Sequence, residues 1–326
     1  VLFRSNHSVY RVEPLYKSFV WAGHKLIDRF GLKTDLENVG TIYNVLALPG
    51  ELDNPVTDTG MTLSELYQAH RELFGCSDEV FPVRMTITCN EGFQSYQSHP
   101  GDEYAMAHEG CRGKVSGAVT LDESDEKGMW LFGHKPMDAK EFRRCIDEKD
   151  WDALFTKLEV KDGDFVHTPA GVIHGGWGSG KVSATFGTNS DITYRFYDND
   201  RNDPTRPLSI DDVCACASFP ELPFKAERPE GVKKDGVTRF VYHDVPGEYV
   251  ALRYKVDGEA SFEHDSFLFV TCVGGNGTVC GELISLGETL FIPVGYGPLE
   301  LSGKMDCIAI RSEEHTSELQ SLHSIS

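Results

Sequence analysis

The chain has 326 residues, of which 40% are hydrophobic and 25% charged, and its formal net charge is −20. This composition is typical of a globular protein large enough for two domains. The acidic balance excludes nucleic acid as an expected partner, and without a run of about 20 apolar residues we expect no membrane partner either. Nine scattered cysteines without a CxxC pair favour reduced thiols and a cytoplasmic location.

The two ends of the chain look foreign to the rest. Residues 1–5 (VLFRS) and 311–326 (RSEEHTSELQSLHSIS) resemble translated sequencing-adapter read-through. We therefore expect both to be non-native tails, with the true N-terminus missing, and exclude them from fold reasoning.

The first half mixes strand and helix patterns. Thr62 and Glu65 form a capping box at the start of a helix for which Gly75 is a stop signal, and Asp138 begins a second helical stretch. Alternation predicts strands, and 3.6-residue periodicity predicts helices. In chain order we expect strands over 40–48, 83–89, 114–121 and 182–198, and helices over 62–74, 138–155 and 209–217.

The stretch GDFVHTPAGVIH, from Gly163 to His174, predicts a strand, a tight turn and the start of a second strand. Pro169 presets φ and Gly171 supplies a positive φ, so the chain reverses there. His174 would then follow the turn on a strand, where it can point into a barrel as a metal ligand. The alternative is a β-hairpin with a surface histidine.

His99 lies 75 residues before His174 (174 − 99 = 75), and Gln97 precedes His99 by two residues. On a strand these two side chains share a face. One amide oxygen and two imidazoles could therefore meet at a single ion. The spacing Gly-x5-Pro-x-Gly-x2-His resembles the second motif of cupin barrels.

The motif recurs 124 residues later, as Gly287-x5-Pro293-x-Gly295, with Pro298 in place of His174. After residue 234 short alternating stretches follow, with turn signals about every 8–12 residues. We therefore expect a mainly β fold of two cupin-type (jelly-roll) barrels with helical insertions in the first half. The expected division is a catalytic-type barrel over 6–218, a linker over 219–234, and a degenerate second barrel over 235–310.

The segments QSHPGDEYA (97–105) and SDITYRFYD (190–198) resemble those of the class I mannose-6-phosphate isomerases of the short bacterial type. The resemblance covers residues from about 10 to about 310. It implies a zinc-dependent aldose–ketose isomerase that interconverts mannose 6-phosphate and fructose 6-phosphate through an enediol. It assigns one divalent metal, zinc, to Gln97, His99 and His174.

The same resemblance assigns catalytic roles to Lys114, Arg195 and Asp191. The two cations would stabilise the enediolate or hold the phosphate. An alternative for Arg195 is a salt bridge with Asp191 or Asp198.

The chain departs from the family pattern at two acidic positions. Ser116 stands where the family has a glutamate ligand, and Thr185 stands where it has an acidic residue. His167 is a possible substitute base or ligand, although alternation cannot say which way it faces. The departures leave open a catalytically weak or inactive sugar-phosphate-binding or regulatory homologue. A cupin enzyme with another substrate would need a two-histidine, one-carboxylate set, which is not visible in the sequence. The sequence leaves the metal, the sugar and the oligomeric state open.

Overall fold

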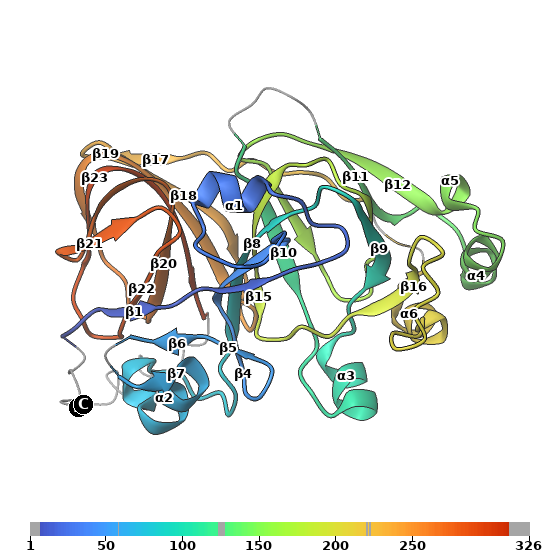
Figure 1. Cartoon of the computed structure of the whole chain (residues 1–326), viewed down its shortest axis with the longest axis horizontal. Coiled ribbons are helices and arrows are strands. Elements are labelled where there is room, and N and C mark those ends of the chain that lie inside the picture. Colours follow the sequence, from blue (N-terminus) through green and yellow to red (C-terminus); the bar gives the residue numbers. More distant parts are fainter. Residues whose placement is uncertain (1–6, 58, 123–127, 220, 222, 313–326) are drawn as a thin grey trace, which may run out of the picture.

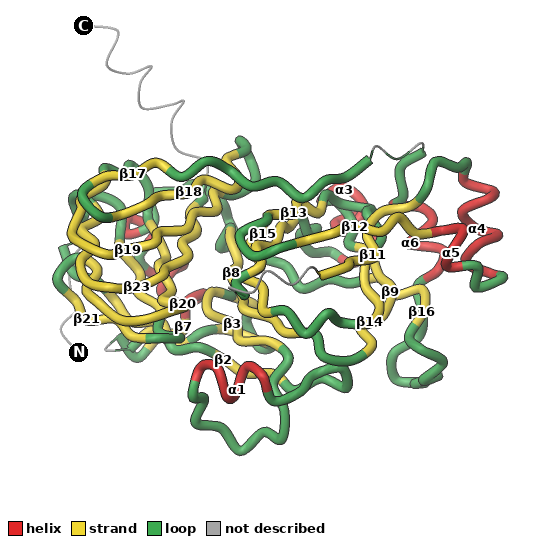
Figure 2. Tube along the Cα trace, turned by 90° about the horizontal axis from the view of Figure 1, so that it is seen from above, coloured by secondary structure: helices red, strands yellow, loops and turns green. Residues whose placement is uncertain are grey.

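The computed structural model describes residues 7–57, 59–122, 128–219, 221 and 223–312. The fold is mainly β, as predicted, with antiparallel strands in three large sheets and one small one (Figures 1 and 2). The predicted tail at 1–5 and residues 313–326 of the one predicted at 311–326 lie outside the described residues, whereas Arg311 is the last residue of β23. Within the described residues no helix is long and apolar enough to cross a membrane.

A ten-stranded sheet occupies the left of Figure 1 and contains the whole C-terminal region. Its alternating side chains face two separate cores: Ile308 and Ile310 pack into one, and Cys307 and Ala309 into the other. In spatial order its strands are β17 (Val232–Lys234), β18 (Val237–Asp244), β19 (Val250–Phe262), β23 (Leu299–Arg311), β20 (Leu268–Val279), β22 (Thr289–Ile292), β1 (Tyr10–Val12), β6 (Pro55–Val56) and β7 (Met61–Thr62), with β21 (Glu282–Ser285) beside β20.

Three strands of this sheet come from the beginning of the chain. β1 pairs with β22, with Tyr10 opposite Phe291, and β6 pairs with β1 through Val12 and Val56. The rings of Tyr10 and Phe291 lie 5.9 Å apart. The N-terminal segment therefore completes the sheet formed by the C-terminal region.

The middle of the chain forms two further sheets, to the right of the first in Figure 1. The six-stranded sheet has the order β13 (Phe165–Thr168), β10 (Ser116–Thr120), β15 (Val182–Thr188), β8 (Val83–Cys89), β3 (Thr41–Val45) and β2 (Leu15–Lys17). The five-stranded sheet has the order β12 (Phe155–Val160), β11 (Gly128–His134), β14 (His174–Trp177), β9 (Phe93–Ser98) and β16 (Tyr194–Tyr197). The fourth sheet is a two-stranded hairpin of β4 (Ala47–Leu48) and β5 (Leu52–Asp53).

The helices are short and peripheral; α4, α5 and α6 gather beyond β16 at the right of Figure 1. The predicted capping box is present, with Thr62 accepting from the Glu65 amide, and Asp138 caps α4. The helix after Thr62 is shorter than expected, because it ends at Ala69 and continues as a 3₁₀ turn. Ser209, the first residue of the predicted helix 209–217, precedes α6, and within the described chain its side chain makes no capping hydrogen bond. The helices are α1 (Lys25–Phe30), α2 (Leu63–Ala69), η1 (Arg71–Leu73), α3 (Asp102–Glu109), α4 (Ala139–Asp147), α5 (Trp151–Leu154) and α6 (Ile210–Cys216).

The predicted strand–turn–strand around Pro169 is present, but it is not a hairpin. β13 belongs to the six-stranded sheet and β14 to the five-stranded one, so the turn connects the two sheets. Gly171 has φ +82°, and a Cβ there would lie 2.1 Å from the Cys216 carbonyl oxygen, so only glycine fits. The repeated motif has the same local form: β22 lies 124 residues after β13, and Gly295 also has a positive φ.

Candidate active site

A cavity of about 560 Å³ lies between the six-stranded and five-stranded sheets. It is lined by residues of β3, β8, β10 and β15 on one wall and by residues of β9, β11, β14 and β16 on the other. The structure brings all the sequence-predicted site residues to this cavity, together with the two departures from the family pattern. They are Gln97, His99, Lys114, Ser116, His174, Thr185, Asp191 and Arg195.

His99 and His174 present the same nitrogen to the cavity. Nδ1 of His99 donates to the Ile192 carbonyl at 2.8 Å, and Nδ1 of His174 donates to the Val172 carbonyl at 3.1 Å. These bonds leave Nε2 of each ring as the nitrogen with a lone pair; that of His174 accepts from the Gln97 amide. The two ring centroids lie 5.0 Å apart. Backbone carbonyls that fix the tautomer in this way are the usual support of histidine metal ligands.

Burial keeps both imidazoles neutral at physiological pH. It lowers the pKa of His174 to about 4, although the Val172 carbonyl opposes the shift. Burial lowers the pKa of His99 well below its usual value, and the charge of Lys114 adds to the effect. The neutral form is the one that binds a metal.

Gln97 stands directly opposite His174 in the pairing of β9 with β14. Its Nε2 lies 3.3 Å from His174 Nε2, while its Oε1 accepts from Ser95 Oγ at 3.0 Å. A ligand role for Gln97 requires the amide to turn and present Oε1. The Ser95 hydroxyl can accept as well as donate, so it supports either orientation.

The cavity is strongly cationic, in contrast to the acidic chain. Among the described residues that line it, Asp191 is the single carboxylate, against six cations: Lys17, Arg84, Lys114, Lys181, Arg195 and Arg206. In a chain of net charge −20, such a concentration of positive charge favours an anionic ligand.

Asp191 joins two of these cations. Its Oδ1 lies 2.7 Å from Arg84 Nη1 and 3.9 Å from Lys114 Nζ. Burial and the nearby charge of Arg84 lower the pKa of Lys114 to about 7, although Asp191 opposes the shift. Burial acts to raise the pKa of Asp191, but Arg84 and Lys114 outweigh it and lower that pKa. Lys114 is therefore a buried amine that changes charge near neutral pH.

Arg195 is held in place by the loop that follows it. Its Nη1 pairs with Asp198 Oδ2 at 3.0 Å, and its Nη2 donates to the Arg206 carbonyl at 2.5 Å. Of the two salt bridges considered for Arg195, the one with Asp198 is therefore present, while Asp191 pairs with Arg84 and Lys114. Arg195 still lines the cavity.

His167 does not line the cavity, whereas its neighbour Thr168 does. Successive side chains of a strand face opposite sides. The hypothesis of a substitute base or ligand at this site is therefore wrong for His167, which faces the ten-stranded sheet.

Sequence reasoning missed Arg84, which is buried and binds both Asp191 and the Ser190 carbonyl, the latter at 2.6 Å. A signal was present in the predicted strand 83–89. Arg84, Thr86 and Thr88 alternate with apolar residues, and all three line the cavity.

Comparisons with known proteins identify the family of the chain. The model of the mannose-6-phosphate isomerase cupin domain matches residues 248–312, which identifies a cupin-type protein. The chain is 31% identical over 307 residues to the mannose-6-phosphate isomerase of Streptococcus mutans, covering 90% of this chain and 95% of that protein. It is 30% identical over 314 residues to mannose-6-phosphate isomerase ManA of Bacillus subtilis, covering 91% and 96%. The chain belongs to the mannose-6-phosphate isomerase family.

Solved structures show the same fold. The crystal structure of the mannose 6-phosphate isomerase from Bacillus subtilis has a TM-score of 0.85 at 26% identity, covering 93% of this chain and 99% of that one. A zinc-bound mannose 6-phosphate isomerase has a TM-score of 0.74 at 12% identity, covering 94% and 100%. At that identity the second similarity concerns the fold alone.

Proposed function

We propose that this chain is a zinc-dependent isomerase that interconverts mannose 6-phosphate and fructose 6-phosphate. The observation that carries the proposal is the pair of Nε2 lone pairs of His99 and His174 in a cavity lined by six cations. The histidines suit a metal, the cations suit a phosphate, and the family relationship supplies the reaction.

Gln97, His99 and His174 would hold the metal. Two neutral imidazoles and an amide oxygen suit a borderline ion such as zinc better than magnesium or calcium. A zinc ion, when bound, would polarise the oxygens at C1 and C2 of the sugar. The hydroxyl of Ser116 is a weak ligand, so this set should bind zinc less tightly than one completed by a carboxylate.

The remaining residues would position the sugar and move protons. Arg195, fixed by Asp198 and the Arg206 carbonyl, is placed to hold the phosphate as a rigid fork. Lys114, with a pKa of about 7, can accept and return a proton near neutral pH, a task that Thr185 cannot perform. Asp191 would be a positioning residue, because it orients Lys114 and Arg84.

The test is a coupled isomerase assay with mannose 6-phosphate on protein of measured zinc content. We expect turnover that is lost on chelation and restored by zinc. His174→Ala should lose the zinc of the cavity, one equivalent, together with turnover. The exposed His108, on α3 outside the cavity, provides a control variant, His108→Ala, that keeps both. Turnover unaffected by chelation would refute the zinc dependence.

A second candidate is a catalytically weak or inactive sugar-phosphate-binding or regulatory homologue. It is favoured by the two hydroxyls, Ser116 and Thr185, at positions where the family resemblance implies acids, and by the pairing of Asp191 with two cations. Calorimetry separates the candidates: sugar-phosphate binding without turnover by zinc-loaded protein would support the second.

We also propose the division into a catalytic-type cupin barrel (6–218), a linker (219–234) and a second barrel (235–310). The cavity between the two central sheets supports the first unit, and the repeated turn at Pro293 supports the second. Strands β1, β6, β7 and β17 cross these bounds, because they pair within the ten-stranded sheet of the second unit. For the site of action we propose the cytoplasm, where sugar phosphates occur.

A further inference from the structure

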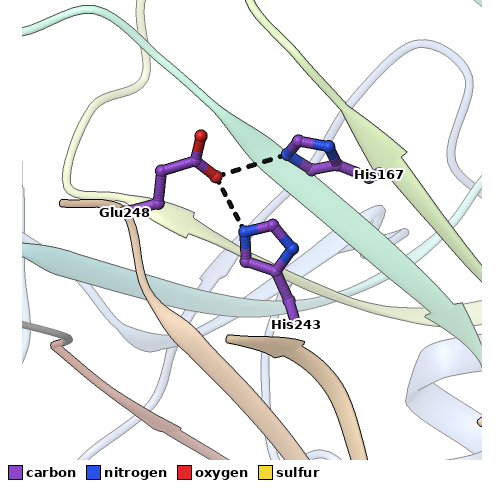
Figure 3. A group of neighbouring side chains, drawn as sticks. All are labelled: His167, His243 and Glu248. Carbon is purple, nitrogen blue, oxygen red and sulfur yellow. Dashed lines mark hydrogen bonds and ion pairs between the residues drawn. The ribbon is translucent and has the colours of Figure 1, made fainter. Parts of the chain in front are cut away.

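Two histidines and one glutamate meet away from the cavity, where the six-stranded sheet packs against the ten-stranded one (Figure 3). His167 lies on the edge strand β13, His243 on β18, and Glu248 in the turn between β18 and β19. The two histidines are 76 residues apart (243 − 167 = 76), so no local spacing reveals the group. A two-histidine, one-carboxylate set, which the sequence did not reveal, is therefore present in the fold.

The three side chains converge on one point. Glu248 Oε2 lies 2.7 Å from His243 Nε2 and 3.4 Å from His167 Nε2, and the two imidazole centroids are 4.5 Å apart. One ligand atom from each residue lies within 4.8 Å of the other two. Ligands around a tetrahedral zinc, each about 2.1 Å from the ion, stand about 3.4 Å from one another. Small side-chain rotations would bring these groups to that spacing.

His167 gives the second, independent observation. Its Nε2 is shielded from water and has a long, poorly aligned contact with Glu248 Oε2, at 3.4 Å, in place of a good hydrogen bond. A nitrogen buried without a hydrogen bond costs free energy that a ligand would recover. His243 makes the shorter contact with the same carboxylate oxygen, so the two imidazoles converge on one acceptor atom, Glu248 Oε2.

The surroundings suit a bound ion that keeps contact with water. His243 is buried, with 7% of its side chain exposed, and stacks on the Tyr249 ring at 4.4 Å. The side chains of His167 and Glu248 remain 34% and 26% exposed. The aromatic contact fixes one ligand, and the exposed side leaves room for water as the remaining ligand.

We propose that His167, His243 and Glu248 form a second metal site, which binds one divalent ion of the zinc class and joins the two sheets. Two imidazoles and a carboxylate favour transition ions over magnesium and calcium. Because each sheet supplies at least one ligand, the ion should stabilise the fold rather than take part in turnover. The site is separate from the cavity, which Thr168 lines from the opposite face of β13.

Metal binding to a protein without the cavity site tests this proposal. Cobalt(II) is titrated into chelator-treated His174→Ala, and the visible absorption of cobalt and the melting temperature are followed. We expect one equivalent bound, a spectrum of four- or five-coordinate cobalt, and a higher melting temperature. Adding His167→Ala should abolish all three signals, whereas adding the surface control His24→Ala should leave them unchanged.

Glu248→Gln is a second variant that keeps the packing of the site. The glutamine amide oxygen can still accept a hydrogen bond from His243, but the negative charge is lost. In the His174→Ala background this variant should weaken cobalt binding by about tenfold or more. No bound equivalent in His174→Ala, or equal binding after His167→Ala, would overturn the proposal. Isomerase activity should persist in His167→Ala with an intact cavity, so failure at either site is distinguishable from failure at the other.

Discussion

Replacing Lys114 by methionine should stabilise the fold while removing a residue of the candidate site. Lys114 is buried, and its pKa falls from 10.5 to about 7 because burial and Arg84 disfavour its charge. Below a pH of about 7 the native state therefore carries the buried, charged ammonium of Lys114. Methionine has a similar length and no charge, and Asp191 would keep its ion pair with Arg84.

The magnitude follows from the two pKa values. The unfolded chain binds the proton more tightly, so the stability of the wild type rises with pH between about 7 and 10.5. At about 1.4 kcal/mol per pKa unit, the penalty approaches about 5 kcal/mol at low pH. It is about 4.5 kcal/mol at about pH 6.5 and about 3 kcal/mol at about pH 8.5, so the advantage of Lys114→Met should shrink by about 2 kcal/mol.

Urea unfolding of metal-free protein at those two pH values measures this difference. Any effect of the substitution on packing is the same at the two pH values, so it cancels in the difference between them. The exposed lysine of α4 gives a matched control, Lys140→Met, for which we expect no such pH dependence. An advantage of Lys114→Met that stays constant or grows with pH would refute the reasoning.

Three further changes test other parts of the structure. Ser116→Glu should supply a carboxylate and tighten zinc binding by about tenfold or more, measured by competition with a chelator; unchanged affinity would contradict the metal geometry. Arg195→Ala should weaken sugar-phosphate binding by about 1.5–3 kcal/mol in calorimetry, and Asp198 would remain paired with Arg201. Gly171→Ala should lower the free energy of unfolding by about 3 kcal/mol or more. The control Gly50→Ala, at a similar φ with open space around it, should lower it by about 1 kcal/mol. Equal losses would rule out the close contact between Gly171 and the Cys216 carbonyl.

Local patterns predicted the elements that position the cavity. The strand expected at 83–89 has those bounds in the structure, and the turn through Pro169 and Gly171 delivers His174 as expected. Alternation of side chains and the conformational limits of proline and glycine act within a few residues, so they can be read from the chain. The same patterns predicted that Gln97 and His99 share a strand face; both line the cavity, although β9 ends at Ser98, one residue before His99.

Interactions between distant segments were not predictable in this way. Local spacing does not show that β13 and β14 belong to different sheets. It also does not show that His167 contacts His243, because that contact depends on how the sheets pack. Electrostatic partners were equally hidden, since nothing in the sequence indicates that Asp191 pairs with Arg84 rather than Arg195. A period-two pattern says which residues share a face but not what that face meets.

The pairing of β1 with β22 has a consequence for how the protein is made. Tyr10 and Phe291 are 281 residues apart (291 − 10 = 281) and stand opposite each other in the sheet. At a synthesis rate of about 5–20 residues per second, roughly 15–60 s separate their emergence from the ribosome. During that interval the first strand has no native neighbour in β22, and contacts of such long range form slowly. Until β22 has emerged, β1 can therefore form only its pairing with β6.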